Sequence, residues 1–346
     1  MKKIVFFVFS LLSLVTCGKR ESVFVVGRQV IASGPEIEKT LSPTAVFSGP
    51  SFLGAIGVMY AADSMVLVAT WKTGYAYRVV NLTNNHAVDL LATGRGPNEV
   101  VAGAFSGVRK EGDRRLLDVT ALNEGYLMSI DLDASVQDGN VVVVDKEEIL
   151  PEAWLSFFVK ENVLSNVIAD ADTYSFKLYS RGDHLILRTE QIFGDEPYLI
   201  QFQPEFESAR YVKPDRTRLC LMMSRFDEIN VLDLVGADHL SISLPKKVKE
   251  DATILNELLA EQTLTSDRFY GGGYVTDDAI YALYLGYDER ETEYVIPSIR
   301  VFSWDGQLKA IYHLDHPVTS IAVSEDGETL YGLTDEEVLY RYDLTQ

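Results

Sequence analysis

The 346 residues include 31 Lys and Arg and 51 Asp and Glu, which gives a formal net charge of −20. This balance argues against nucleic-acid binding, which needs a basic footprint, and against electrostatic docking onto anionic lipid. Hydrophobic residues make up 47% and charged residues 24%, which excludes wholesale disorder, and the 11% aromatic content favours strands.

The first sixteen residues have the organisation of a signal peptide. Lys2 and Lys3 form a short basic region, and residues 4–15 are apolar apart from two serines. This run is too short to span a hydrocarbon core of about 30 Å but suits the apolar part of a secretion signal. We therefore expect residues 1–16 to be a signal peptide.

The end of this segment resembles the lipobox of bacterial lipoproteins. Leu14 and Cys17 match that pattern, and the resemblance implies that Cys17 is the lipidation site and that residues 17–44 form a lipidated tether. The acyl chains would anchor the protein, each buried CH₂ contributing about 0.8 kcal/mol. Residues 18–21 lack the acidic cluster that resembles a surface-export signal, which favours the periplasmic side of the outer membrane over the cell surface. The alternative is an ordinary secretory signal in which Cys17 is coincidental.

Further along the chain one pattern recurs: an apolar strand, a tight turn rich in Asp or Gly, and a second apolar strand. Asp and Gly suit such turns because they tolerate positive φ. The pattern occurs at residues 58–70, 108–120, 178–190, 274–285 and 321–334. The turns lie near positions 63, 113, 183, 278 and 327, with spacings of 50, 70, 95 and 49 residues. The two shorter spacings indicate a period near fifty residues.

The two longer spacings have separate explanations. The spacing of 70 indicates one period plus an insertion, which we place at residues 146–162 as helix or loop. The spacing of 95 is nearly two periods, so one repeat has a degraded first hairpin. Further hairpins at 229–244 and 299–313 supply the second half of two repeats. Each repeat is therefore about four strands.

Repeated four-stranded units of this length predict a β-propeller. A blade cannot bury both of its faces alone, so blades pack against one another around a central axis. Six copies account for residues 45–346, which we predict to be an all-β, six-bladed propeller with four-stranded antiparallel blades. The last blade ends at its third strand, and a segment at 45–47, or earlier at 23–31, would supply the fourth and close the ring.

Two features lie outside the strand pattern. Ile254, Leu255, Leu258 and Leu259 recur at helical spacing behind Asp251, which predicts a short helical insertion over residues 251–262. Once Cys17 is lipidated, Cys220 has no cysteine left to pair with, and it lies in an apolar run. We interpret Cys220 as a buried small hydrophobe and not as a nucleophile.

Taken together, these features resemble the six-bladed, TolB-like propeller lipoproteins of Bacteroidetes-type bacteria. The most specific local match is residues 94–99 (Gly-Arg-Gly-Pro-Asn-Glu), where proteins of that family often carry a Gly-x-Gly-Pro-x-Glu segment. Residues 320–327 also resemble the inner-strand hairpin of many propeller families. The resemblance implies a fold and an envelope location, and it implies no established catalytic machinery.

Candidate site residues follow from the propeller register. Connections between blades and between second and third strands share one face of the disc, and such loops usually carry function. That face is predicted to hold the tentative ligand-binding residues Trp71, Lys72, Arg95, Glu99, Asn123, Glu124, Glu190, His316 and Asp335. Trp71 is the strongest candidate for ligand binding, because an aromatic ring at a turn can stack on a sugar or a peptide. It could instead cap the end of a blade. Arg95 and Glu99 lie in a loop without a Walker or Rossmann pattern, so they either hydrogen-bond that loop or face a ligand.

Motifs for metal or covalent chemistry are weak. Residues 131–139 lack the glycine that an EF-hand loop carries at its sixth position. His313 and His316 have no identifiable third ligand for a metal ion. We therefore predict neither a metal site nor a cofactor, and we keep Ca²⁺ at the channel mouth as a minor option. There is no Gly-x-Ser-x-Gly elbow, and Cys220 lacks a recognisable His partner, so no catalytic residue is assigned.

Two functions from different classes remain. The leading prediction is a lipid-anchored binding or scaffold protein of the cell envelope that presents one propeller face to a protein or glycan, with no nucleic-acid partner. The rival is a glycan-acting hydrolase or lyase with its site at the mouth of the central channel. Propellers host both kinds of function, so the fold does not decide between them.

Overall fold

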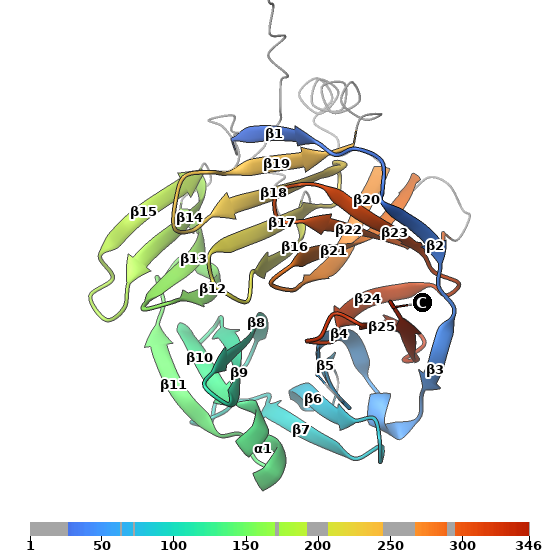
Figure 1. Ribbon diagram of the computed structural model, residues 1–346. Helices are drawn as coiled ribbons and strands as arrows, with labels where there is room; N and C mark the ends of the chain where they lie inside the picture. The colour runs from blue at the N-terminus through green and yellow to red at the C-terminus, as the bar shows by residue number, and fades with distance from the viewer. Residues whose placement is uncertain are drawn as a thin grey trace, which may run out of the picture.

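Six antiparallel sheets surround a central axis in the computed structural model, which describes residues 27–62, 64–71, 73–169, 173–191, 207–244, 267–288 and 295–345 (Figure 1). The first strands of neighbouring sheets contact one another around the axis. This arrangement confirms the predicted six-bladed β-propeller with four-stranded antiparallel blades.

We number the blades 1 to 6 by the chain order of their innermost strands. Blades 1 to 3 are formed by β4 (Ala55–Ala62), β5 (Met65–Thr70), β6 (Tyr75–Asn81), β7 (Ala87–Ala92); β8 (Gly103–Glu111), β9 (Arg114–Ala121), β10 (Tyr126–Asp131), β11 (Val143–Glu148); and β12 (Ala153–Val159), β13 (Asn162–Ala169), β14 (Thr173–Ser180), β15 (Ile186–Gln191). Blades 4 to 6 are formed by β16 (Glu207–Val212), β17 (Arg218–Met223), β18 (Glu228–Asp233), β19 (Leu240–Ser243); β20 (Asp267–Val275), β21 (Ala279–Asp288), β22 (Ser298–Ser303), β23 (Leu308–His313); and β24 (Val318–Val323), β25 (Thr329–Thr334), β26 (Leu339–Asp343), β3 (Pro43–Phe47).

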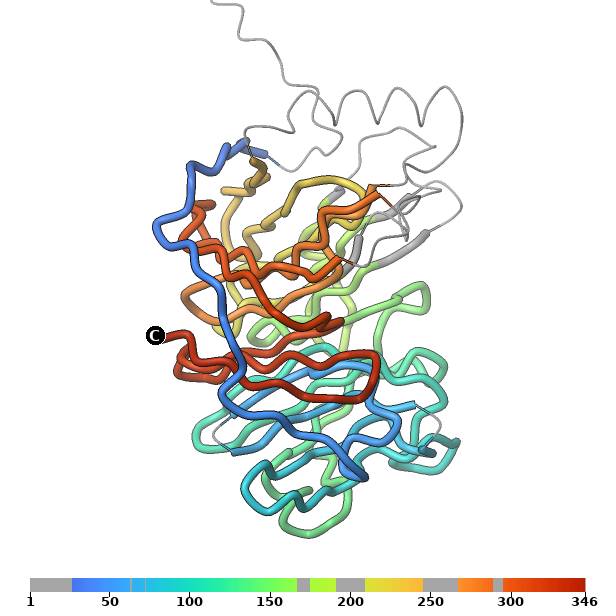
Figure 2. Tube along the Cα trace, turned by 90° about the vertical axis from the view of Figure 1, so that its right-hand side faces the viewer, coloured from blue at the N-terminus to red at the C-terminus, as the bar shows by residue number. Residues whose placement is uncertain are grey.

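The N-terminal segment runs along the outside of three blades. β1 (Arg28–Ile31) pairs in parallel with β19, and β2 (Ile37–Thr40) pairs in parallel with β23. β3 then pairs antiparallel with β26 as the fourth strand of blade 6. Of the two segments considered for ring closure, β3 is therefore the one that closes it. Figure 2 shows this segment in blue along the edge of the disc.

The hydrophobic core lies between blades, as expected if a single blade cannot bury both faces. One buried cluster joins blades 4 and 5 through Met222, Ile229, Ile280 and Phe302, and other clusters join blades 1 and 2, 5 and 6, and 6 and 1. Cys220 belongs to the first of these clusters and is fully buried. Burial raises the pKa of its thiol, which confirms its interpretation as a small hydrophobe.

The structure corrects the predicted register of blade 3. Residues 146–162 are not a helical or loop insertion, because they contain the end of β11, all of β12 and the start of β13. The hairpin at 178–190 joins the third and fourth strands, β14 and β15, and not the first and second. The first hairpin turns at Lys160 and Glu161, a sequence with neither Gly nor Asp; Lys160 itself adopts a φ of 55°.

Short helices occur at two places in the described residues. η1 (Pro50–Phe52) precedes blade 1, and α1 (Leu132–Asp138) lies between β10 and β11. Asp131 caps α1 by accepting a hydrogen bond from the Ala134 N–H (3.0 Å). The helix predicted at residues 251–262 lies outside the described residues, as do residues 1–16 and Cys17. Within the described part of the chain, no helix has the length and apolar character needed to cross a bilayer.

Candidate functional site

Alternate turns of each blade lie at opposite ends of its strands, so the two faces of the disc carry different sets of turns. We call the face with the first-to-second and third-to-fourth turns the hairpin face. The opposite face carries the second-to-third turns and the connections between blades, and we call it the connection face. Eight of the nine tentative site residues map to connection-face segments, and Glu190 lies within β15; the side chain of Lys72 lies outside the described residues.

Exposed apolar side chains gather on the connection face over blades 1 and 2. A cleft of about 370 Å³ is lined by Ile56, Trp71, Tyr75 and Val101, among others, and the Trp71 side chain is 56% exposed. Exposed Leu53 and Leu122 lie beside this cleft. The Trp71 N–H donates to the carbonyl of Gly54, the neighbour of Leu53, at 3.0 Å. The Leu122 N–H donates to the carbonyl of Ala102, the neighbour of Val101, also at 3.0 Å. We call these side chains the apolar rim: Leu53, Ile56, Trp71, Tyr75, Val101 and Leu122.

The loop at residues 94–99 borders the apolar rim and is held by Glu99. The Glu99 carboxylate accepts a hydrogen bond from the Gly96 N–H at 2.7 Å and packs over the loop. A Cβ at Gly94 would lie 2.0 Å from Glu99 Oε2, and one at Gly96 would lie 2.8 Å from its carboxyl carbon. A side chain at either position would therefore displace the Glu99 carboxylate. Glu99 holds this loop together, while Arg95 is exposed.

Glu124 has a similar role in the next turn. Its Oε1 accepts a hydrogen bond from the Val101 N–H at 2.9 Å, which ties the turn between β9 and β10 to the connection between blades 1 and 2. Its Oε2 is buried and has no hydrogen-bond partner in the structure. Asn123 beside it is exposed. Glu124 thus positions Val101 of the apolar rim.

The remaining tentative residues lie away from the apolar rim. Glu190, within β15, contacts Arg188 and, at 3.2 Å, His239 Nε2 in the third-to-fourth turn of blade 4, which links blade 3 to the hairpin-face side of blade 4. His316 Nδ1 lies 2.6 Å from Asp315, and its ring stacks on Tyr340 at 3.9 Å. Asp335 is an exposed turn residue of blade 6. The structure brings Trp71 together with the 94–99 loop and Glu124, and it does not bring Glu190, His316 or Asp335 to them.

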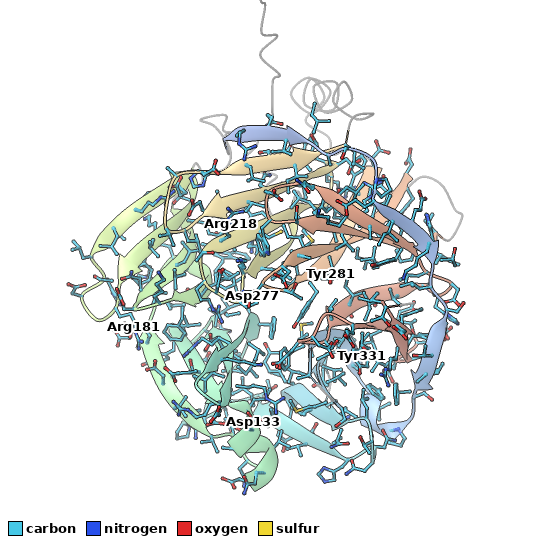
Figure 3. The ribbon with its side chains drawn as sticks, viewed as in Figure 1. Asp133, Arg181, Arg218, Asp277, Tyr281 and Tyr331 are labelled. Atoms are coloured by element: carbon cyan, nitrogen blue, oxygen red, sulfur yellow. The ribbon has the colours of Figure 1, made fainter. Side chains whose placement is uncertain are left out.

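A second cavity, of about 270 Å³, opens where the inner strands reach the hairpin face. Its wall contains the aromatic side chains Tyr60, Phe105, Tyr211 and Tyr274. Burial raises the pKa of Tyr211 to about 12, so its hydroxyl stays protonated at neutral pH. Phe105 lines both this cavity and the cleft of the apolar rim. Figure 3 labels Asp277, another lining residue, beside the centre of the ring.

The acidic side chains at this channel mouth are engaged within the protein. Glu325 accepts hydrogen bonds from the Tyr60 hydroxyl and from Lys110 Nζ (2.7 Å), and Asp277 accepts one from the Asp215 N–H (3.0 Å). His313 pairs with Glu38 and not with His316. Across the residues that the structure describes, no group of three or more His, Cys, Asp or Glu side chains is arranged to hold a metal ion.

A third cavity, of about 480 Å³, lies on the hairpin face between blades 2, 3 and 4 and shares Arg109, Lys110, Pro214 and Arg216 with the channel mouth. Arg216 is only 7% exposed, and its terminal nitrogen lies 3.5 Å from the fully buried Asp118. Arg109 Nε contacts the same carboxylate at 3.0 Å. Burial raises the pKa of Asp118, with Arg216 and Arg109 opposing that shift.

Sequence reasoning missed this basic cavity. Its cationic side chains come from hairpin turns of three blades, at positions around 109–114, 160, 181 and 216, which are far apart in the chain. Arg216 follows Pro214 and Asp215 in the first hairpin of blade 4, which is the repeat with the degraded first hairpin in the sequence pattern. The register of the first-to-second turns could have indicated this cavity, because those turns place basic residues at the ends of neighbouring innermost strands.

Comparison with known proteins gives information about the fold. No family model and no curated protein matches the sequence. Among solved structures, a member of the DUF4221 family from Bacteroides vulgatus aligns with a TM-score of 0.54 at 12% identity, covering 88% of this chain and 97% of that one. A chain of a mitotic checkpoint complex aligns with a TM-score of 0.47 at 11% identity, covering 91% and 98%. At 12% identity, the likeness to the Bacteroides protein shows that the two chains share a fold.

Proposed function

We propose that this protein is a binding module of the cell envelope that uses the apolar rim to hold a partner protein. The observation that carries the proposal is the exposure of Leu53, Ile56 and Trp71 beside one cleft. Contiguous exposed apolar side chains are uncommon on monomeric proteins and mark interaction sites. A propeller presents such side chains on rigid strand ends, so little ordering is needed when a partner binds.

The chemistry of the rim favours a protein partner over a glycan. Trp71 and Tyr75 could stack on sugar rings, but Leu53, Ile56, Val101 and Leu122 are aliphatic. Aliphatic side chains gain free energy by burial against other apolar groups, at about 25 cal/mol per Å². Aromatic anchors surrounded by aliphatic contacts are typical of protein interfaces.

Binding is also favoured over hydrolysis. The rival function places a glycan-cleaving site at the channel mouth, where paired carboxylates would act as acid and base. Glu325 and Asp277 lie there, but both accept hydrogen bonds from neighbouring protein groups, and Asp118 is buried between two guanidinium groups. We therefore do not propose the glycan-acting enzyme.

The envelope location is part of this proposal and depends on the N-terminal sequence. We propose that Cys17 is lipidated, as in the TolB-like propeller lipoproteins that the chain resembles, and that the protein faces the periplasm from the outer membrane. Metabolic labelling with an alkyne fatty acid tests this, since Cys17→Ser should abolish both labelling and membrane fractionation. Unchanged fractionation of Cys17→Ser would contradict the anchor without bearing on the rim.

The partner is tested with the full chain as bait in crosslinked envelope extracts. A captured protein is identified, purified and titrated against wild type and against the double variant Ile56→Ser/Trp71→Ala, which we expect to weaken binding at least tenfold, or about 1.4 kcal/mol. Glu99 stays intact, because its substitution would disturb the loop that it holds. The matched control is Leu187→Ser/Val235→Ser, which removes exposed apolar side chains elsewhere on the disc.

Two results would overturn the proposed partner. Equal affinity of wild type and the rim variant would exclude the rim as the interface. Binding of purified envelope polysaccharide that requires Trp71, without any protein that requires it, would replace the protein partner by a glycan.

A further inference from the structure

Cationic side chains are concentrated in one cavity although the protein as a whole is acidic. The cavity between blades 2, 3 and 4 is lined by six Arg or Lys side chains and by two acidic ones, Glu111 and Asp145. The six are Arg109, Lys110, Arg114, Lys160, Arg181 and Arg216. Four of these six pair with acidic side chains: Arg109 with Asp118, Lys110 with Glu325, Arg114 with Glu111, and Arg181 with Asp145 and Glu147.

The deepest of these cations lacks a full set of partners. Arg216 Nε is buried and has no hydrogen-bond partner among the described residues. The nearest acidic group, Asp118, also binds Arg109 Nε at 3.0 Å and accepts a hydrogen bond from the Ser129 hydroxyl at 2.6 Å. Asp118 is therefore shared by two guanidinium groups, of which Arg109 is partly exposed and also lies 3.9 Å from Glu111.

A buried charge that the protein compensates incompletely favours the binding of a counter-ion. Removing a charge from water is costly unless partners compensate it, and native structures normally supply them. Burial lowers the pKa of Arg216; Asp118 and Asp277 oppose that shift, and Arg109 adds to it. An anion in the cavity that Arg216 lines would give this side chain a further partner.

The backbone around Arg216 is shaped to place it there. Arg216 adopts a φ of 63°, and Gly107 on the facing inner strand adopts a φ of 120° within a β-bulge. A Cβ at Gly107 would lie 3.9 Å from Arg216 Nη1, so the guanidinium group lies directly against this bulge. Left-handed backbone is strained for arginine, and such strain is retained where surrounding structure or function requires it.

The neighbouring channel mouth indicates what else the ligand carries. Arg216 also lines that cavity, together with Tyr60, Phe105 and Tyr211 and with the carboxylates of Asp215, Asp277 and Glu325. A small molecule with an anionic group at Arg216 would lay an apolar or aromatic part against these rings. Polyanions such as nucleic acids are disfavoured by the net charge of −20.

We propose that Arg216 and Arg109 bind the oxyanion of a small amphipathic ligand, a carboxylate or a phosphate, whose apolar part contacts Tyr60, Phe105 and Tyr211. Lys110 and Lys160 lie at the exposed edge of the site and attract the anion electrostatically. The cavity opens on the hairpin face and shares Met59 and Phe105 with the cleft of the apolar rim, but none of the six rim residues lines it, so its test does not depend on the proposed partner.

The test is calorimetric titration of the purified full chain with four probes: benzoate, phenyl phosphate, inorganic phosphate and uncharged benzamide. We expect saturable binding of benzoate or phenyl phosphate, weaker binding of inorganic phosphate and none of benzamide. The better of the first two probes identifies the head group. Arg216→Met should weaken binding by about tenfold to a hundredfold, since it removes a charge-assisted hydrogen bond.

Controls keep the outcome decisive. Arg114→Met removes an exposed cation of the same cavity that pairs with Glu111 and should change affinity less than about threefold. Arg216→Lys retains the charge but loses the planar fork, so it should show an intermediate loss even if Arg216→Met fails to fold. Failure of every anionic probe to saturate by about 10 mM, or equal affinity of wild type and Arg216→Lys, would overturn the site.

Discussion

The connection face exposes uncharged side chains beside one cleft, whereas the hairpin face holds charges that are partly or wholly buried. On the connection face, Leu53, Ile56 and Trp71 are largely exposed and contribute little to the core. On the hairpin face, Arg216 is buried in the turn between β16 and β17 and contacts Asp118, which is buried within β9. Both faces are built on the same repeat of strands, so the strand framework does not dictate what its turns carry. Substitutions on the two faces should therefore affect stability very differently.

The largest effect is expected at Asp118. Asp118→Asn removes the carboxylate that both Arg109 and Arg216 contact, and it leaves the buried Arg216 and the partly exposed Arg109 without it. Breaking a buried pair in this way costs about 3–5 kcal/mol in the free energy of unfolding, measurable by urea denaturation. Asp113→Asn, in the exposed turn of the same hairpin, is the control and should lie within about 0.5 kcal/mol of wild type. Equal stabilities of the two variants would contradict the buried cluster.

A smaller loss is expected at the bulge beside Arg216. Gly107→Ala forces a side chain onto a φ of 120°, which should cost about 1–3 kcal/mol and lower the melting temperature. Gly34→Ala is the matched control, because a Cβ there meets nothing within 4 Å and its φ is not in the positive region. A melting temperature of Gly107→Ala no lower than that of Gly34→Ala would show that the bulge is unstrained.

On the connection face, stability should hardly change. Leu53→Ser and Ile56→Ser each replace a side chain that is more than half exposed, so the free energy of unfolding should stay within about 0.5 kcal/mol of wild type. Chemical denaturation measures this, with buried Phe52→Ala as the destabilising comparison. A loss approaching that of Phe52→Ala would mean that the rim belongs to the core and is not a free surface.

The smallest effect concerns pH and a hairpin-face turn. A hydrogen bond from the Ser324 hydroxyl, followed by one from the Glu328 N–H, lowers the pKa of Asp326. The resulting stabilisation is fully present above the carboxyl pKa of the unfolded chain, about 3.9, and is lost as pH falls through the lower folded value. Asp326→Asn should therefore be slightly less stable than wild type at pH 7, and the difference should disappear in strong acid. Asp335→Asn, an exposed turn variant on the connection face, serves as the charge control; an equal pH-dependent difference there would contradict the turn explanation.

Much of the fold could be predicted from turn chemistry, because Asp and Gly mark hairpins in most blades. The prediction failed in blade 3, where the first hairpin turns at Lys160 and Glu161 and Lys160 takes positive φ without being glycine. The Gly182 and Asp183 turn was visible, but turn residues do not reveal whether a hairpin joins first and second or third and fourth strands. The pairing of β14 with β15 in the structure shows that this turn joins the third and fourth strands.

The site was less predictable than the fold. Register alone placed Trp71 on the connection face, and the neighbouring Glu99 was found in the loop that it holds. The sequence could not indicate that Glu190 lies against His239, or that Arg216 shares Asp118 with Arg109, because each contact joins different blades. Such contacts depend on blade-to-blade packing, which leaves no periodic pattern in the chain.

The path of β1 and β2 has a mechanical consequence for a tethered disc. Both strands lie on the outermost edges of blades 4 and 5, so the described chain begins at the circumference of the disc. Tension applied at β1 would load the outer strand ladders before reaching the innermost strands. Both flat sides would stay open to the surroundings at once, so that a small solute and a large companion could be held together without competing for room.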